Sequence, residues 1–328
     1  MHFLITGVAG FIGATTALRL LEDGHSVVGV DSLDGHYSVA LKRMRLSRLH
    51  ARPEFVFHQL DLAEPGSLLH LPEASRIDRV IHLAAQAGVR RSMADPHPYV
   101  SSNIVGHLTV LEFCRRMPRK PDLVYASSSS VYGDSVAETQ NEDDLCGEPA
   151  SLYAVTKRTD EMMSQAYADL YGVNQTGLRL FTVYGPWGRP DMAYWLFTSK
   201  ALRDEPIDLF NHGNMARDFT YIDDAVDGLV RVATKSDWSS GANTGHHIFN
   251  LGTGWTETLG ALVEAVQAAT GRTIQINTRP MQAGDVHRSR ADITRISEQF
   301  GYLPTVGLAE GVRRFVDWFM SDPDLALI

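Results

Sequence analysis

The chain has 328 residues, of which 44% are hydrophobic and 21% charged, so it can bury the core of one large or two closely packed domains. Its formal net charge of -9 argues against a nucleic-acid or membrane-surface protein, whose binding face would be basic. The two cysteines, Cys114 and Cys146, lack metal-ligand spacing, so we expect neither a disulfide framework nor a metal site.

The first residues resemble a strand and a turn rather than a signal peptide, and no run of about 18 apolar residues occurs later in the chain. Together with the low cysteine content, this pattern predicts an intracellular, cytoplasmic protein without a membrane segment.

A short apolar strand at residues 2–6 leads into three glycines with three-residue spacing, Gly7, Gly10 and Gly13, and then into a helix that ends near Gly24. Glycines here allow a tight turn, close approach of the backbone to a pyrophosphate, and close packing of the helix on the strand. The pattern predicts a dinucleotide-binding turn, and an ordinary strand-to-helix turn is the alternative.

The next strand, residues 26–30, ends at Asp31, 18 residues beyond Gly13. At this position a carboxylate accepts hydrogen bonds from the adenosine ribose, and the same charge repels a 2'-phosphate. The sequence therefore favours NAD over NADP, with a solvated turn aspartate as the alternative.

Helices and strands continue to alternate, which predicts an α/β fold with a Rossmann-type, doubly wound parallel sheet whose ligands bind at the carboxyl ends of the strands. The expected elements are a helix at 39–49, a strand at 54–58, a short helix, a strand at 78–83, a helix at 97–116 and a strand at 123–126. At such ends Asp61 and Leu62 are placed to meet the adenine, and Leu83, Ala84 and Ala85 leave room beside the backbone.

Four serines, residues 127–130, follow the strand at 123–126 directly, although some of their hydroxyls can serve the strand's terminal backbone instead. Downstream, Tyr153 and Lys157 are four residues apart, so on a helix they share one face. A nearby ammonium favours the phenolate and brings the phenol pKa toward the working range of an acid/base group. The pair predicts a proton shuttle for an alcohol, and an ordinary surface pair is the alternative.

The motifs described above occur in the same order as in extended short-chain dehydrogenase/reductases that act on nucleotide sugars. The chain resembles these enzymes over essentially its whole length. Four longer segments look like UDP-glucuronate 4-epimerases: residues 86–90, 127–133, 181–192 and 217–224. The resemblance implies NAD as cofactor, a UDP-sugar as substrate, and a homodimer formed through the helices before Arg116 and after Ser151.

The same resemblance assigns roles to individual residues. The implied catalytic residues are Tyr153, Lys157 and Ser128. The implied cofactor-binding residues are Gly7, Gly10, Phe11, Ile12, Gly13, Asp31, Lys42, Asp61, Leu62, Leu83, Ala84, Ala85, Tyr153, Lys157 and Tyr184. The implied substrate-binding residues are Gln86, Arg90, Ser128, Ser129, Ser130, Tyr153, Thr182, Arg189, Arg217, Gln282 and Asp285. Arg217 is expected at the diphosphate and Asp285 at the uridine ribose.

The implied reaction is a reversible oxidation at C4' of the sugar. Tyr153, as a phenolate, takes the 4'-hydroxyl proton while C4' passes a hydride to NAD, and Ser128 hydrogen-bonds the same oxygen. The 4-keto sugar must then present its other face before the hydride returns. The site is therefore expected to hold the nucleotide tightly and the hexose loosely.

Four positions discriminate among the reactions of the superfamily. Ser129 and Ser130 stand where related dehydratases and decarboxylases carry acidic residues, which disfavours elimination because serine does not readily supply the extra acid/base. Thr182 with Arg189 suits a sugar carboxylate, because a guanidinium can hold a carboxylate bidentately. The alternative for Arg189 is a solvent-facing loop arginine or a partner of Asp191.

A 4-keto uronate is a β-keto acid and can lose carbon dioxide. We expect Ser129, Ser130, Thr182 and Arg189 to hold the carboxylate away from the geometry that favours this loss, so replacing Arg189 or Thr182 should raise the fraction of pentose product. Decarboxylation of UDP-glucuronate, 4-epimerisation of UDP-glucose and, more remotely, a non-catalytic NAD-sensing regulator stay open.

Residues 1–181 are expected to form the NAD-binding domain and residues 182–328 a smaller, interleaved substrate-binding lobe, with returns to the first domain near 217–250. The expected elements of the lobe are a strand at 217–221, a helix at 223–232, a strand at 247–250, a helix at 256–269, a loop at 281–290, a helix after Asp292 and a helix at 308–320.

Overall fold

The computed structural model describes residues 1–134, 137–144, 146–235, 245–282, 284–322 and 325. Its first half contains β1 (His2–Thr6), α1 (Phe11–Glu22), β2 (Ser26–Asp31), α2 (Val39–His50), β3 (Phe55–Gln59), β4 (Arg79–His82), α3 (Val89–Ala94), α4 (His97–Tyr99), η3 (Val100–Val105), α5 (Gly106–Arg116), β5 (Asp122–Ser128), η4 (Ser129–Tyr132), α6 (Leu152–Tyr171) and β6 (Gln175–Leu180). Its second half contains β7 (Thr182–Tyr184), α7 (Ala193–Leu202), β8 (Ile207–Phe210), β9 (Ala216–Arg217), β10 (Phe219–Tyr221), α8 (Ile222–Thr234), β11 (His246–Leu251), β12 (Glu257–Thr258), α9 (Leu259–Thr270), β13 (Ile276–Arg279), α10 (Thr294–Phe300) and α11 (Leu308–Ser321).

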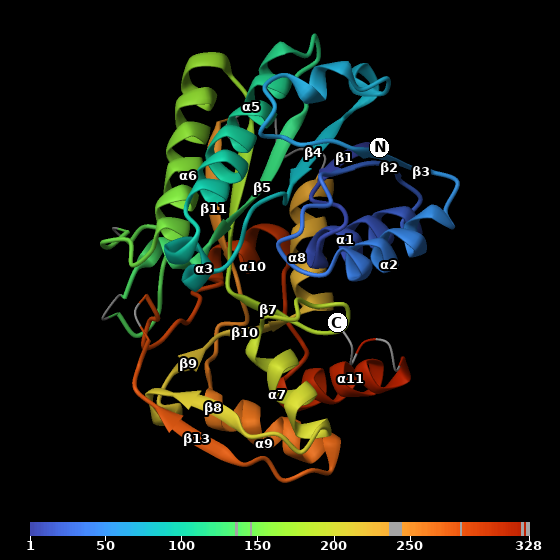
Figure 1. The fold of residues 1–328 in the computed structure, drawn as a ribbon. Coiled ribbons are helices and arrows are strands. Elements are labelled where there is room, and N and C mark those ends of the chain that lie inside the picture. Colours follow the sequence, from blue (N-terminus) through green and yellow to red (C-terminus); the bar gives the residue numbers. More distant parts are fainter. Residues whose placement is uncertain (135–136, 145, 236–244, 283, 323–324, 326–328) are drawn as a thin grey trace.

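The main sheet has seven parallel strands in the order β11-β6-β5-β4-β1-β2-β3. Helices α5 and α6 lie on one side of this sheet, and α1, α2 and α8 lie on the other (Figure 1). The predicted α/β doubly wound fold is confirmed. The order of the strands reverses between β1 and β4, which is where such sheets open a crevice for ligands at their carboxyl ends.

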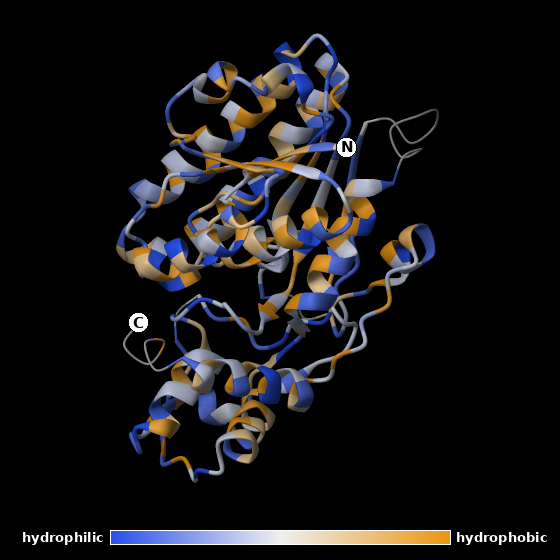
Figure 2. Ribbon diagram, turned by 90° about the vertical axis from the view of Figure 1, so that its right-hand side faces the viewer, coloured by the Kyte–Doolittle hydropathy of each residue, from blue (hydrophilic) through white to orange (hydrophobic). Residues whose placement is uncertain are grey.

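Both faces of the sheet are buried, so its central strands carry apolar residues on both sides. Alternate residues of β1 show how this works: Phe3 and Ile5 pack into the cluster that includes α1 and α8, while Leu4 packs with the cluster beneath α5. Along the helices, orange and blue segments alternate because only one side of each faces the core (Figure 2).

A smaller part of the molecule lies below the sheet in Figure 1, built from α7, α9, α11 and short strands. Strand β8 pairs with β13 in parallel, and β9 pairs with β12 in antiparallel orientation. The chain also returns to the main sheet from this part, because α8 packs on α1 and β11 forms the outermost strand beside β6. Within the described residues, no helix is long and apolar enough to cross a membrane.

Several expected elements differ from those observed. The helix expected at 97–116 contains a π-helical stretch, Val100–Val105, in which the Asn103 amide binds both backbone groups of Gln86. The strand expected at 217–221 is broken at Asp218, whose buried carboxylate accepts from the backbone of Thr253, Gly254 and Ala291.

The helix expected at 256–269 begins only at Leu259, because residues 257–258 pair with β9 and Thr258 caps the helix through Ala261 N–H at 3.0 Å. Strand β13 was not predicted, and all four of its residues are exposed, so they lack an apolar pattern.

Candidate active site and cofactor pocket

The glycine turn after β1 packs against the end of β4 and opens α1. Gly7 has φ +71°, and a Cβ added there would lie 2.6 Å from the Ala84 backbone nitrogen. A Cβ on Gly13 would lie 2.2 Å from the Gly7 carbonyl oxygen. The turn therefore requires glycine at both positions, and the N-terminus of α1 is left facing the crevice between β1 and β4, as a diphosphate site needs.

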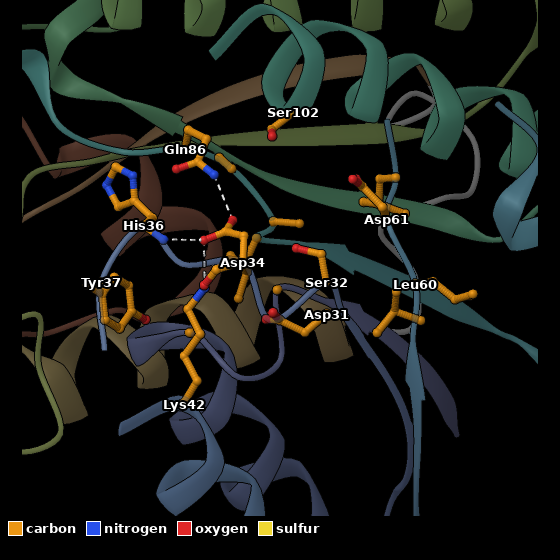
Figure 3. Close-up of a pocket in the computed structure, with 17 residues that line it drawn as sticks. Asp31, Ser32, Asp34, His36, Tyr37, Lys42, Leu60, Asp61, Gln86 and Ser102 are labelled. Atoms are coloured by element: carbon orange, nitrogen blue, oxygen red, sulfur yellow. Dashed lines mark hydrogen bonds and ion pairs between the residues drawn. The ribbon is translucent and has the colours of Figure 1, made fainter. Parts of the chain in front are cut away.

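A pocket opens above this turn, at the carboxyl ends of β1 to β4 (Figure 3). The sequence-predicted residues that line it are Gly7, Gly10, Asp31, Lys42, Asp61, Leu62, Leu83, Ala84, Ala85 and Gln86. The other predicted cofactor residues are not part of this pocket's lining, namely Phe11, Ile12, Gly13, Tyr153, Lys157 and Tyr184. The sequence thus identified most of one continuous cavity wall from residues far apart in the chain.

Asp31 is buried at the end of β2 and accepts hydrogen bonds from Ala9 N–H at 3.0 Å and Leu33 N–H at 2.8 Å. Burial raises its pKa, because the low-dielectric surroundings disfavour the charged form. A carboxylate has about four acceptor positions, so acceptor capacity remains for a diol. This geometry fits the ribose hydroxyls of a dinucleotide.

Asp34 joins three segments at the edge of the pocket, and it was not identified from the sequence. Its carboxylate accepts from Lys42 Nζ at 3.0 Å, His36 N–H at 2.9 Å and Gln86 Nε2 at 2.6 Å. Figure 3 marks these contacts with dashed lines. Burial opposes a low pKa at Asp34, but the hydrogen bonds from His36 N–H and Lys42 and the Lys42 charge together lower it. Lys42 was predicted to bind the cofactor and Gln86 the substrate. Asp34 therefore fixes both side chains in the same pocket wall.

The predicted catalytic residues come from α6 and β5. Ser151 caps α6 by accepting from Ala154 N–H at 3.2 Å, which places Tyr153 in the first turn and Lys157 one turn later. Lys157 is buried and donates from Nζ to the Ala126 carbonyl at 3.0 Å. Because Ala126 precedes Ser128 on the same strand, this bond brings the α6 pair to the end of β5 where Ser128 lies.

Ser128 caps the short η4 helix that carries Ser129 and Ser130. Its Oγ accepts from Ser130 N–H at 3.1 Å, so the serine cluster turns sharply at the sheet's edge. Ser128 is in register with Leu180 of β6, two residues before Thr182, and Thr182 therefore emerges at the same edge.

Arg189 lies close to the Tyr153 ring because both contact the segment formed by Ala87, Gly88 and Tyr99. Its guanidinium binds Asp191 at 3.0 and 2.5 Å and donates to the Ala87 carbonyl at 3.1 Å. Tyr99 donates to the adjacent Gly88 carbonyl at 2.9 Å, and its ring lies edge-on to Tyr153 with centroids 6.3 Å apart. The alternative partner considered for Arg189, Asp191, is thus the one that it has in this structure. No motif in the sequence identified Tyr99 as a residue of the site.

The residues predicted for the nucleotide end also come together. Arg90 pairs with Asp285 at 3.2 Å, and its guanidinium carbon lies 5.1 Å from the centre of the Phe210 ring. Arg217 donates to the His287 carbonyl at 3.3 Å. Gln282 precedes Asp285 in the same loop, and its Oε1 is buried without a partner among the described residues.

Tyr184 lies apart from the predicted catalytic residues and from the residues predicted for the nucleotide end. Its side chain is fully buried among aromatic rings, and its hydroxyl donates to the Gly307 carbonyl at 3.3 Å. Burial raises its pKa far above the usual value. Only its backbone is left to meet a cofactor, so the predicted role can involve the backbone alone.

Comparison with known proteins gives a consistent result. Residues 3–252 match the NAD dependent epimerase/dehydratase family. The chain is 40% identical over 331 residues to a probable UDP-glucuronate 4-epimerase of Rhizobium meliloti, with 97% of each protein covered.

Two crystal structures are similar over nearly the whole chain. The UDP-glucuronic acid 4-epimerase of Bacillus cereus, in complex with UDP-glucuronic acid and NAD, has a TM-score of 0.89 at 32% identity and covers 98% of this chain and 99% of its own. The UDP-glucose 4-epimerase of Thermotoga maritima, with UDP-glucose, has a TM-score of 0.87 at 31% identity and the same coverage.

Proposed function

Because this chain belongs to the NAD dependent epimerase/dehydratase family, we propose that it converts UDP-glucuronate to UDP-galacturonate by 4-epimerisation. NAD is the cofactor of the enzyme, and the substrate belongs to the nucleotide sugars. The observation that carries the finer assignment is Arg189, a guanidinium fixed on the Ala87 carbonyl beside the Tyr99 and Tyr153 rings.

The cofactor would be held by the glycine turn, by Asp31 at the adenosine ribose and by the wall that Lys42 and Asp34 form. Bound NAD would supply the reversible hydride transfer at C4' of the sugar, first away from one face and then back to the other. The protein's own contribution is to bind both molecules, exclude water and manage one proton.

Tyr153 takes the proton of the 4'-hydroxyl and later gives it back, so no net proton is consumed. Lys157, one helical turn away and buried, supplies the positive charge that favours the phenolate. Ser128 stands at the end of the strand that Lys157 contacts, and its hydroxyl would hold the same sugar oxygen.

The sugar must turn over between the two hydride transfers while the nucleotide stays bound. Arg217 at the diphosphate and Asp285 at the uridine ribose are the proposed anchors, with Arg90 fixing Asp285. The hexose then needs few fixed contacts besides its carboxylate. Ser129, Ser130 and Thr182, at one edge of the sheet, would share that carboxylate with Arg189 and discourage loss of carbon dioxide.

A second candidate is 4-epimerisation of UDP-glucose. It is favoured by one observation: Asp191 occupies two donors of Arg189, and a neutral hydroxymethyl group would leave that pair undisturbed. UDP-glucuronate decarboxylation and an NAD-sensing regulator are the outcomes to be separated by product analysis.

We also propose that the enzyme works in the cytoplasm, where Cys114 and Cys146, both free in the structure, would stay reduced.

Substituting Arg189→Gln tests the assignment, because glutamine keeps hydrogen-bonding capacity and loses the charge. A charged hydrogen bond is worth about 1.5–3 kcal/mol, so kcat/KM for UDP-glucuronate should fall roughly 10- to 100-fold while that for UDP-glucose changes little. The fraction of pentose product should rise as well. Arg203→Gln, at an exposed ion pair with Glu205, is the matched control. Equal losses on both sugars would contradict a role of Arg189 that is specific to the sugar carboxylate.

A further inference from the structure

The Lys157 ammonium has a second partner besides the Ala126 carbonyl. Asp160, three residues later on α6, receives a hydrogen bond from Nζ at 3.2 Å. The side chains of the lysine and the aspartate are only 4% and 1% exposed. An ammonium has three donors, so these two contacts leave one N–H for a ligand at the site.

The other oxygen of Asp160, Oδ1, is buried and has no hydrogen-bond partner among the described residues. The ionisable neighbours that surround it are Lys157 and Glu161 on α6, His107 on α5 and Tyr125 on β5. His82 on β4 lies one step further away, beside His107 and Lys157.

Lys157 is the only one of these neighbours able to compensate the Asp160 charge. Glu161 is negative and engaged with Arg179 at 2.9 Å. Burial lowers the pKa of both histidines, so they are neutral, and it raises the pKa of Tyr125, whose phenol stays protonated.

We propose that Asp160 is a positioning residue, which fixes the Lys157 ammonium against the end of β5 and limits how much of its charge reaches Tyr153. This inference rests on the proposed role of Tyr153 as the acid/base group. It follows from geometry: a buried carboxylate that shares one ammonium with a strand carbonyl both orients that ammonium and offsets its field.

The arrangement has a consequence for pH dependence. Burial raises the pKa of Asp160 to about 6, although the Lys157 charge opposes the shift. Above that pH the carboxylate is ionised and offsets the ammonium. As the pH falls below it, Asp160 becomes neutral and more of the Lys157 charge acts on Tyr153, which favours the phenolate where acid would otherwise protonate it. Asp160 thus makes the fall of kcat/KM toward acid pH more gradual.

The test uses Asp160→Asn and Asp160→Ala in the full-length enzyme. Asparagine keeps an oxygen for Nζ but carries no charge, so the acid limb of kcat/KM should move to lower pH by roughly one unit and become steeper. Alanine removes the orienting contact, so kcat should fall at least 10-fold with KM nearly unchanged. Asp169→Asn, also on α6 but at the surface, should match the wild type. An unshifted acid limb in Asp160→Asn would overturn the proposal.

A second readout needs neither cofactor nor substrate. Asp160 has a folded-state pKa above the 3.8 of the free side chain, so the wild type should lose stability relative to Asp160→Asn as the pH rises from about 4 to about 7. Urea unfolding at several pH values measures this difference. A constant difference would overturn the role of the Asp160 charge even if the enzyme proved inactive on UDP-glucuronate. If the protein were inactive on UDP-glucuronate but the stability difference still changed with pH, only the proposed function would be contradicted.

Discussion

Tyr153 is the single residue on which the proposed chemistry depends most, because its phenol takes and returns the proton. Substituting Tyr153→Phe removes one oxygen and keeps the ring that packs against Tyr99. General acid/base catalysis contributes about 10²–10⁴-fold, so kcat should fall by that amount while the far-UV spectrum and melting temperature stay nearly unchanged.

Tyr171→Phe is the matched control for this substitution. Tyr171 is the last residue of the same helix, where its ring lies edge-on to that of Tyr167, and its substitution should leave turnover unaffected. If Tyr153→Phe retained more than about a tenth of the wild-type kcat, another group would have to move the proton, and the assignment of Tyr153 would be wrong.

At this scale, local spacing in the sequence identified some residues and missed others. Asp31 is recognisable because it ends a strand at a set distance from the glycine turn, and Tyr153 with Lys157 because a helix brings both to one face. Asp34 and Tyr99 act through partners 52 and 11 residues away, Gln86 and Gly88, and no local spacing reveals such contacts.

Among the elements, the glycine turn and the start of α1 form the most constrained unit of the cofactor pocket. In Gly13→Ala the new methyl group would lie 2.2 Å from the Gly7 carbonyl, so α1 must shift away from the turn. Overpacking of this kind costs about 1–3 kcal/mol. We expect a lower melting temperature without added cofactor and a smaller increase on adding NAD, both measured by calorimetry.

Gly307→Ala is the matched control, because nothing lies within 4 Å of a Cβ at that position and its φ is -73°. Alanine there should change the melting temperature little, since the reduced freedom of the unfolded chain offsets the lower preference of alanine for the N-cap position of α11. A normal response to NAD in Gly13→Ala would contradict the close packing that we describe.

Element boundaries were predictable where apolar periodicity is strong and not where buried polar groups decide. Strands β1, β2, β4 and β5 have clear apolar runs and lie close to their expected positions. The break at Asp218 depends on amides from residues 253, 254 and 291, which the sequence does not place near it.

For the whole molecule, the alternation of strands and helices was sufficient to predict the sheet's class, because parallel strands require helical crossovers. The pairing of β11 with β6 and of β13 with β8 joins segments far apart in the chain. Such pairings depend on tertiary packing, which explains why the smaller part was predicted only in outline.

Exposed apolar side chains on α5 and α6 favour the expected homodimer. They include Leu108, Val155, Met162 and Leu170. We expect light scattering after size exclusion to give the mass of two chains, and Met162→Glu to shift it toward one, because a charge would be buried in the interface. Met320→Glu is the matched control, since Met320 on α11 is 59% exposed against 63% for Met162. A monomeric wild type would rule out this assembly.

The measurement that tests the central proposal most directly is a product analysis. Purified protein is incubated with UDP-glucuronate, without added NAD, and the products are resolved by chromatography and mass spectrometry. A product of unchanged mass that co-elutes with UDP-galacturonate is the predicted result, and it would also show that the protein retains NAD. A product lighter by carbon dioxide, or no turnover even with NAD supplied, would contradict 4-epimerisation of UDP-glucuronate.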